Sequence, residues 1–514
     1  EMVIRDWSSD VCSSDLSSFS LREMDRFGAS SLITRTTNDI TQVQQVTFMS
    51  QRMMAHAPLM AIGGLVMALS TEPQLAWILL VVLPVLTVAI IVLARKGMPW
   101  FKAIQEKIDT LNRVLRENLA GMRVIRAFDR TDHEHRRFDR ANLDLTETTL
   151  KVNRLMAFLF PFIMLMMNIT SVAIVWFGGQ GVGEGAIKIG SLMAFIQYTM
   201  QIMFSVVMVS VIFIMIPRAS VSAARINEVL GVEPEIVDPP QAPAAAEAMA
   251  TAAATGTGAT GSQPAARPGR VEFRDVTFGY GGAAEPALKG VSFVAEPGTT
   301  TAIIGGTGSG KSSIINLITR FYDVAAGSVM LDGVDVREYR QADLRARLGL
   351  ATQRPVLFSG TIADNIRFGS ASATDSETEE AASIAQASEF IEQKEGGMQA
   401  PIAQGGTNVS GGQKQRLSIA RVLARKPSVY LFDDSFSALD FRTDARLRAA
   451  LRRHTTDATV IIVAQRVGTI LDADCILVLD DGQIVGRGTH RELMGTCSVY
   501  REIVASQMSA EEAV

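Results

Sequence analysis

Long apolar runs without Asp, Glu, Lys or Arg fill much of the N-terminal half of the chain. Four such windows cover residues 53–71, 74–94, 155–183 and 189–217. A helix needs about 20 apolar residues to cross a bilayer, and buried helices of soluble proteins rarely stay uncharged over that length. The pattern predicts four membrane-spanning helices. The first, which contains His56 and Pro58, has the weakest signal.

Basic residues orient these predicted spans. The connection 95–154 holds 14 Lys or Arg, whereas the short connections near 71–73 and 178–188 hold only Lys188. Connections rich in Lys and Arg stay on the cytoplasmic side of a membrane. We therefore expect a multi-pass protein of the plasma or inner membrane whose long connection and C-terminal half are cytoplasmic.

The C-terminal half has a different pattern, in which short apolar strands alternate with helical segments. Residues 271–278 alternate as a half-buried strand does, and 299–304, 428–432 and 460–464 are continuous apolar runs typical of buried parallel strands. This predicts an α/β domain over residues 269–508, with a tail at 509–514. An all-α membrane domain at 17–230 precedes it, and the Ala-, Gly-, Thr- and Pro-rich segment 231–268 is expected to be a flexible linker.

A glycine-rich loop follows one of these strands and opens a helix. Glycines let backbone N–H groups turn inward around phosphate oxygens, and the helix N-terminus adds its positive dipole end. Lys311 would reach the outer phosphates of a nucleotide, and the Ser312 hydroxyl would bind Mg²⁺. The predicted phosphate-site residues are Gly305, Gly306, Thr307, Gly308, Ser309, Gly310, Lys311, Ser312 and Ser313.

Two further motifs follow this loop in order. Residues 409–413 read Val-Ser-Gly-Gly-Gln, and the apolar strand 428–432 ends in Asp433. The three motifs together resemble the nucleotide-binding domain of ATP-binding cassette (ABC) proteins. The resemblance implies that the nucleotide is ATP, that Tyr280 stacks on the adenine, and that Gln353 joins Ser312 and Asp433 around Mg²⁺.

The resemblance also implies a dimer. In this family the signature motif closes over ATP held by a partner domain, and the D-loop bridges the two sites. The signature would be Val409, Ser410, Gly411, Gly412 and Gln413, and the D-loop Ser437, Ala438, Leu439 and Asp440.

Two positions depart from the pattern of hydrolytic family members. Asp434 stands where these have the glutamate that acts as general base, and its carboxylate would sit roughly 1.5 Å short. A misplacement of about 1 Å can cost on the order of 100-fold in rate. Gln465 stands where the family has a histidine beside the γ-phosphate, and glutamine cannot carry positive charge. A milder change is Gln404, where many relatives have glutamate.

The membrane half resembles an ABC exporter half with a departure of its own. Residues 28–42 and 117–128 resemble the first and second intracellular loops, and the helix expected over 105–126 would extend a span into the cytoplasm. Exporter halves have six spans, whereas four are predicted here. Residues 1–16 match nothing in the family, so we expect a non-native start to a truncated membrane domain.

The departures favour one half of a heterodimeric exporter, which binds ATP at a degenerate site and completes the site of a second half-transporter. A self-sufficient homodimeric exporter is the alternative. The cargo would be a small hydrophobic or amphipathic molecule, with drug, lipid and peptide all open. The net charge of −4 argues against a nucleic-acid partner. Three cysteines, Cys12, Cys475 and Cys497, have neither metal nor disulfide spacing.

Overall fold

The computed structural model describes residues 16, 18–239, 268–283 and 285–507. The chain divides into two compact units. Residues 29–232 form the membrane unit, and residues 233–507, together with the described residues before 29, form the ATP-binding unit. The N-terminal stretch predicted to be non-native and the tail 509–514 fall almost entirely outside the described residues.

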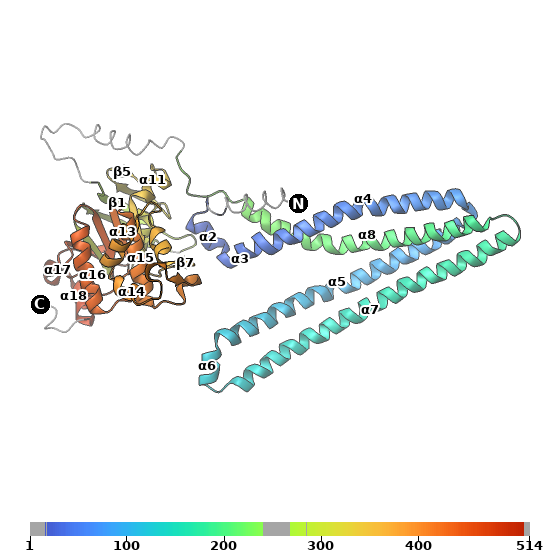
Figure 1. Ribbon diagram of the computed structural model, residues 1–514, viewed down its shortest axis with the longest axis horizontal. Coiled ribbons are helices and arrows are strands. Elements are labelled where there is room, and N and C mark those ends of the chain that lie inside the picture. The colour runs from blue at the N-terminus through green and yellow to red at the C-terminus, as the bar shows by residue number, and fades with distance from the viewer. Residues whose placement is uncertain (1–15, 17, 240–267, 284, 508–514) are drawn as a thin grey trace. The chain divides into compact units, whose positions relative to one another are not determined.

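The membrane unit consists of long helices (Figure 1). Two short segments, α3 (Ala29–Thr34) and a π-helical turn (Arg35–Asp39), lead into α4 (Ile40–Thr71). A turn at Pro73–Leu75 then begins α5 (Ala76–Ala120), which is followed by α6 (Met122–Ala127), α7 (Thr131–Gly183) and α8 (Ile189–Leu230). Helix α4 packs along α8, and α5 packs along α7.

Four stretches of these helices are long and apolar enough to cross a membrane among the described residues. They are Ala29–Thr71, Pro73–Gly97, Pro161–Gly183 and Ile189–Val209. They match the four predicted spans. A core of large side chains, including Leu79, Leu86, Ile174 and Phe195, holds the helices together.

The helix expected over 105–126 is not continuous. Helix α5 ends at Ala120, Gly121 turns the chain with φ −88° and ψ 5°, and α6 begins at Met122. A Cβ at Gly121 would lie 2.9 Å from the Glu117 carbonyl oxygen, which explains why a glycine occupies this turn.

The ATP-binding unit is built on a six-stranded sheet of order β12-β11-β3-β10-β9-β6. Its strands are β3 (Thr300–Gly305), β6 (Leu348–Ala351), β9 (Val429–Asp433), β10 (Thr459–Val463), β11 (Cys475–Asp480) and β12 (Gln483–Gly488). All neighbouring pairs are parallel except β11 and β12. These two form an antiparallel hairpin, whose turn residues Asp481 and Gly482 have positive φ.

A second sheet of order β2-β1-β4-β5 contains β1 (Val271–Phe278), β2 (Leu288–Ala295), β4 (Ala326–Leu331) and β5 (Val334–Asp335). Strands β7 (Gly360–Thr361) and β8 (Pro401–Ile402) form a small pair. The helices are α2 (Leu21–Phe27), α10 (Lys311–Ile318), α11 (Gln341–Ala346), α12 (Ile362–Arg367), α13 (Asp375–Ile384), α14 (Ser388–Glu392), α15 (Gly411–Arg425), α16 (Phe441–His454), α17 (His490–Thr496) and α18 (Ser498–Gln507).

The order of the strands positions the site. Strand β10 lies between β3 and β9, with β6 beyond β9. Because parallel strands bring their carboxyl ends to one edge of the sheet, the segments after β3, β6, β9 and β10 meet there. These segments carry the glycine-rich loop, Gln353, Asp434 and Gln465.

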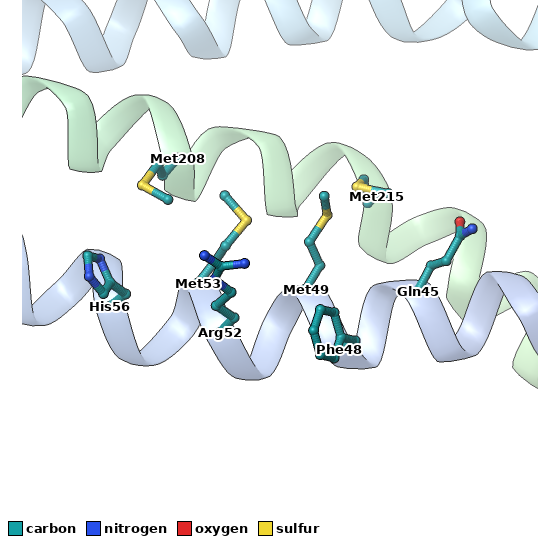
Figure 2. Close-up of a pocket in the computed structure, with 8 residues that line it drawn as sticks. All are labelled: Gln45, Phe48, Met49, Arg52, Met53, His56, Met208 and Met215. Carbon is teal, nitrogen blue, oxygen red and sulfur yellow. The ribbon is translucent and has the colours of Figure 1, made fainter. Parts of the chain in front are cut away.

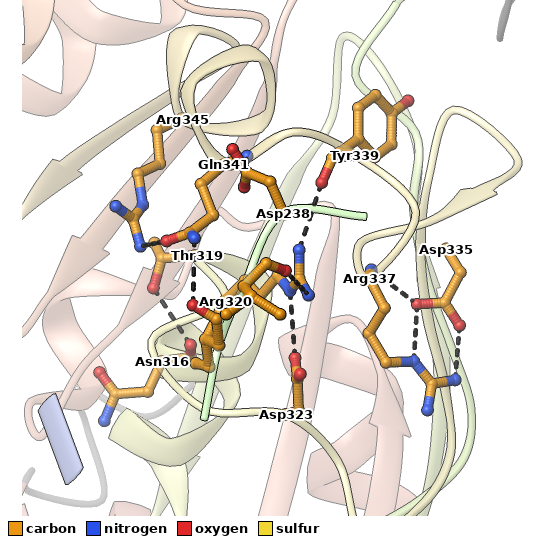
Figure 3. Close-up of polar contacts among 12 residues, drawn as sticks. Asp238, Asn316, Thr319, Arg320, Asp323, Asp335, Arg337, Tyr339, Gln341 and Arg345 are labelled. Carbon is orange, nitrogen blue, oxygen red and sulfur yellow. Dashed lines mark hydrogen bonds and ion pairs between the residues drawn. The ribbon is translucent and has the colours of Figure 1, made fainter. Parts of the chain in front are cut away.

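Residues 233–238, at the start of the predicted linker, pack against the ATP-binding unit (Figure 3). The Arg320 side chain is buried and donates to the carbonyls of Val237 and Tyr339, both at 3.2 Å, and to Asp323. Gln341 contacts the same segment through Ile236 and Asp238. Residues 240–267 of the predicted linker lie outside the described residues.

Helix α2 is bound to the same segment. The Arg22 guanidinium pairs with Glu235 at 2.5 Å, and the buried Glu23 carboxylate accepts from the Glu235 backbone N–H at 3.3 Å. We call residues 233–238 the docked strap. The structure therefore assigns α2 and the docked strap to the ATP-binding unit.

Candidate functional site

The loop between β3 and α10 has a backbone that glycine alone fits easily. Gly308 and Gly310 have φ of 84° and 97°, a region that side chains with a Cβ rarely adopt. A Cβ at Gly305 would lie 2.1 Å from the Leu479 carbonyl oxygen, and one at Gly310 would lie 2.5 Å from that of Ala287. Backbone conformation and close packing thus explain why glycines occupy positions 305, 308 and 310 of the loop.

The Lys311 side chain folds over this loop. Its Nζ donates to the carbonyl oxygens of Gly305 at 3.0 Å and Gly306 at 2.6 Å. Burial lowers the pKa of Lys311, an effect that the nearby charges of Asp434 and Asp433 oppose. The ammonium group is therefore held at the mouth of the loop, where the phosphate chain of a nucleotide would lie.

Ser312 and Asp433 lie together although they are far apart in sequence. The Ser312 hydroxyl donates to Asp433 Oδ1 at 3.0 Å. Burial raises the pKa of Asp433, and the neighbouring Asp434 charge adds to this while the Ser312 hydrogen bond opposes it. A hydroxyl beside a carboxylate is an all-oxygen donor pair, which suits Mg²⁺.

Asp434 is the centre of a group of side chains. Its Oδ2 accepts from the Gln353 amide at 3.2 Å and from the Gln465 amide at 3.0 Å. Asp434 is 7% exposed and has φ 47°. Burial raises the pKa of its carboxyl group, whereas hydrogen bonds from Gln353 and Ser437 lower it.

The structure thus brings together both residues at which the sequence departs from the hydrolytic pattern. Gln353, which we expected at the metal, donates its amide N–H to Asp434. The sequence did not predict this group, because its three members come from three separate strand ends.

Tyr280 lies within an aromatic cluster. Its ring packs edge-on against Phe278 and Tyr322, with centroids 4.9 and 5.2 Å apart. Its hydroxyl lies 3.1 Å from Ser313 Oγ and accepts from the Asn316 amide at 3.3 Å. The ring is thereby fixed beside the first turns of α10. Tyr322 and Asn316 were not predicted to belong to the site, although they follow the glycine-rich loop closely in sequence.

The signature segment begins α15. Ser410 caps this helix: its Oγ accepts from the Gln413 N–H at 3.3 Å, and the Gln413 side chain accepts from the Ser410 N–H at 3.0 Å. Nothing lies within 4 Å of a Cβ built at Gly411. A capped helix start with open space at its first residue can receive an anion.

The D-loop lies directly against the signature. A Cβ at Gly412 would be 3.1 Å from the Ala438 carbonyl oxygen. Ser437 donates to the Asp434 carbonyl at 2.9 Å, Leu439 is buried, and Asp440 caps α16. A continuous chain of contacts therefore joins Asp434 to the signature.

Comparisons with known proteins agree with this architecture. The family model for the ABC transporter transmembrane region matches residues 11–206, and the ABC transporter model matches residues 288–437. An uncharacterized ABC transporter ATP-binding protein of Mycobacterium tuberculosis is 44% identical over 95% of this chain and 81% of its own length. A fatty acid ABC transporter ATP-binding/permease protein of M. tuberculosis is 33% identical over 92% of this chain and 71% of its own length.

Among solved structures, a bacterial Atm1-family ABC exporter with ATP bound matches with a TM-score of 0.74. It is 27% identical, and the match covers 99% of this chain and 87% of that one. Its match over almost the whole chain includes both the helical unit and the α/β unit. The chain belongs to the ABC transporter family, and it is a multi-pass membrane exporter that carries its transmembrane region and its ATP-binding domain on one polypeptide.

Proposed function

We propose that this chain is one subunit of an exporter dimer whose own ATP site binds nucleotide but turns it over slowly. The observation that carries this proposal is the engagement of Asp434. The carboxylate oxygen that would have to polarise an attacking water accepts two amide hydrogen bonds, from Gln353 and Gln465. A general base must itself reach the water proton. The Asp434 side chain is one methylene shorter than glutamate, and its Oδ2 already accepts two hydrogen bonds.

The binding part of the site is complete by contrast. Lys311 and the N–H groups of the glycine-rich loop would hold the phosphates, and Ser312 with Asp433 would hold Mg²⁺. The metal would neutralise phosphate charge when bound. Gln465 adds no positive charge beside the γ-phosphate, so stabilisation of charge developing there is weaker than with a histidine.

The signature segment supports a role for this chain in a partner's site. Ser410 and the first N–H groups of α15 form an anion-binding helix start, and Gly411 leaves it open. Among the described residues, no hydrogen bond or ion pair joins this segment to Lys311 or Asp433. We therefore propose that Val409–Gln413 closes over ATP held by the second subunit, where most hydrolysis takes place.

For the cargo, we propose a hydrophobic or amphipathic lipid. The described spans are apolar, and one relative is named for fatty acids. Export of such a molecule would follow from closure of the two ATP-binding domains.

A self-sufficient homodimer is the second candidate. It is favoured by one observation: position 434 keeps a carboxylate at the end of β9, next to Ser312 and Asp433, the two residues that would hold Mg²⁺. In this case Asp434 would act as a weak base.

The test is ATP hydrolysis by the full chain in lipid nanodiscs, compared with an Asp434→Glu/Gln465→His variant. We expect slow turnover in the parent and an increase of about 10- to 100-fold in the variant, with ATP affinity unchanged in both. Asp434→Asn is the control that removes the base. Parent turnover that matches the double variant and is lost in Asp434→Asn would instead establish the homodimer.

A further inference from the structure

A cavity of about 480 Å³ lies between α4 and α8 within the membrane unit (Figure 2). Its walls are mainly apolar and come from Phe48, Met49, Met53, Met208 and Met215, with Arg52 among them. The side chains of Met49, Arg52 and Met53 extend from α4 toward α8. A volume of this size is in the range of small-molecule sites.

Arg52 is the one Asp, Glu, Lys or Arg residue between Ile40 and Thr71. The part of α8 that faces it, residues 189–217, has none. No hydrogen bond or ion pair joins Arg52 to any residue that the structure describes. The walls therefore hold an uncompensated cation. Arg52 lies in the helix that holds the first candidate span, Ala29–Thr71, directly before its uncharged window 53–71.

The nearest carboxylate along α4 cannot neutralise Arg52. Asp39 lies about 20 Å away at 1.5 Å per residue. Its carboxylate is also used elsewhere, since it accepts from Ser222 at 2.8 Å and lies 3.9 Å from the Arg225 guanidinium. The positive charge in the cavity is thus available to a ligand.

The surroundings of Arg52 define what kind of anion fits. Four methionines line the cavity, and their flexible thioether chains adapt to irregular apolar shapes. His56 lies one turn further along the same face of α4 and offers a second polar contact. A small inorganic anion would leave the apolar walls unused, and a neutral lipid would leave the guanidinium unpaired.

We propose that this cavity binds an anionic amphiphile, with Arg52 on the headgroup and the methionines on the hydrocarbon. The headgroup would be a carboxylate or a phosphate, and a guanidinium can bind either one in a bidentate manner. The inference rests on the proposed export of lipid-like cargo. It specifies that the cargo is negatively charged and that its headgroup contacts Arg52.

The test uses photoactivatable probes on the full chain in phosphatidylcholine nanodiscs. A diazirine fatty acid is compared with the matching fatty alcohol, and a diazirine phosphatidic acid with the matching diacylglycerol. Crosslinks to peptides containing residues 45–56 and 208–215 are quantified by mass spectrometry. We expect the acidic member of at least one pair to label these peptides more strongly than its neutral partner, and the stronger pair identifies the headgroup.

Variants at Arg52 separate charge from shape. Arg52→Met keeps an apolar wall of similar length and should reduce acid labelling about 10-fold, whereas Arg52→Lys should retain most of it. Arg113→Gln, at an exposed position of α5, is the control and should change nothing. Unchanged size-exclusion behaviour and ATP binding show that each variant is folded.

Three outcomes would overturn the inference. If acids and neutral partners label equally, or if Arg52→Met leaves acid labelling unchanged, the cavity does not select charge, and the proposed ATP chemistry and lipid cargo still stand. If none of the four probes labels the cavity peptides, the proposed lipid cargo loses its support as well. The Asp434 experiment is independent of all three outcomes.

Discussion

The two sides of the ATP site differ in whether backbone groups or side chains form them. At the end of β3, backbone groups and one lysine form the binding loop, and close packing against Leu479 and Ala287 fixes its shape. At the ends of β6, β9 and β10, three side chains (Gln353, Asp434 and Gln465) are joined by hydrogen bonds and form the proposed catalytic side. Changing one side chain can remove hydrolysis without disturbing the loop. Binding and turnover can therefore be lost independently, and we propose that this chain keeps binding while its turnover is slow.

Removing the lysine should break the binding side most strongly. Lys311→Ala deletes the cation at the mouth of the loop, and charge-assisted hydrogen bonds of this kind are worth about 1.5–3 kcal/mol. We expect ATP affinity to fall about 100-fold, measured with a fluorescent ATP analogue. Lys289→Ala is the control, because among the described residues that lysine forms surface ion pairs with Glu285 and Asp481. Retained affinity in Lys311→Ala would place the phosphates elsewhere.

The signature and the base can be compared in the purified two-subunit complex. Aspartate caps helices as well as serine does, so Ser410→Asp keeps the start of α15 but repels a phosphate. We expect turnover of the complex to fall about 100-fold, whereas Asp434→Ala should change it only a few-fold.

Ser410→Ala serves as a milder version that removes the hydroxyl without adding charge. Equal losses in Ser410→Asp and Asp434→Ala would contradict the proposed division of work between the subunits.

The smallest effect concerns the backbone of the loop. Gly310→Ala forces a Cβ into positive φ and toward the Ala287 carbonyl, which should lower the free energy of unfolding by about 1–3 kcal/mol. Gly306→Ala is a matched control: nothing lies within 4 Å of its Cβ, and its φ is not positive. Thermal unfolding of the ligand-free protein measures both. Equal losses of stability would mean that loop shape does not depend on Gly310.

Features that depend on local pattern could be predicted from the sequence. The four spans follow from uncharged apolar runs, and the glycine-rich loop follows from its place between a strand and a helix. The break at Gly121 could not be predicted, because the polar and apolar spacing continues across it.

Features that depend on long-range contacts were missed. The pairing of two glutamine amides with one oxygen of Asp434 requires the strand order β3-β10-β9-β6, which the sequence alone does not specify. The proposed role of Arg52 could not be predicted, because a single charge beside an apolar window is typical of the end of a span. Its isolation is visible only when α8 is placed against α4.

The docked strap changes how the connection between the two halves should be understood. Residues 233–238 are fastened to Arg320 and Gln341, and α2 is fastened to the strap through Glu235. Residues 29–232 are thus flanked on both sides by segments that belong to the ATP-binding unit. A protease site engineered within residues 240–267 and then cut should leave two fragments that co-purify without denaturant. Arg320→Ala combined with Gln341→Ala removes side-chain hydrogen bonds that join the strap to the C-terminal fragment and should let the fragments separate.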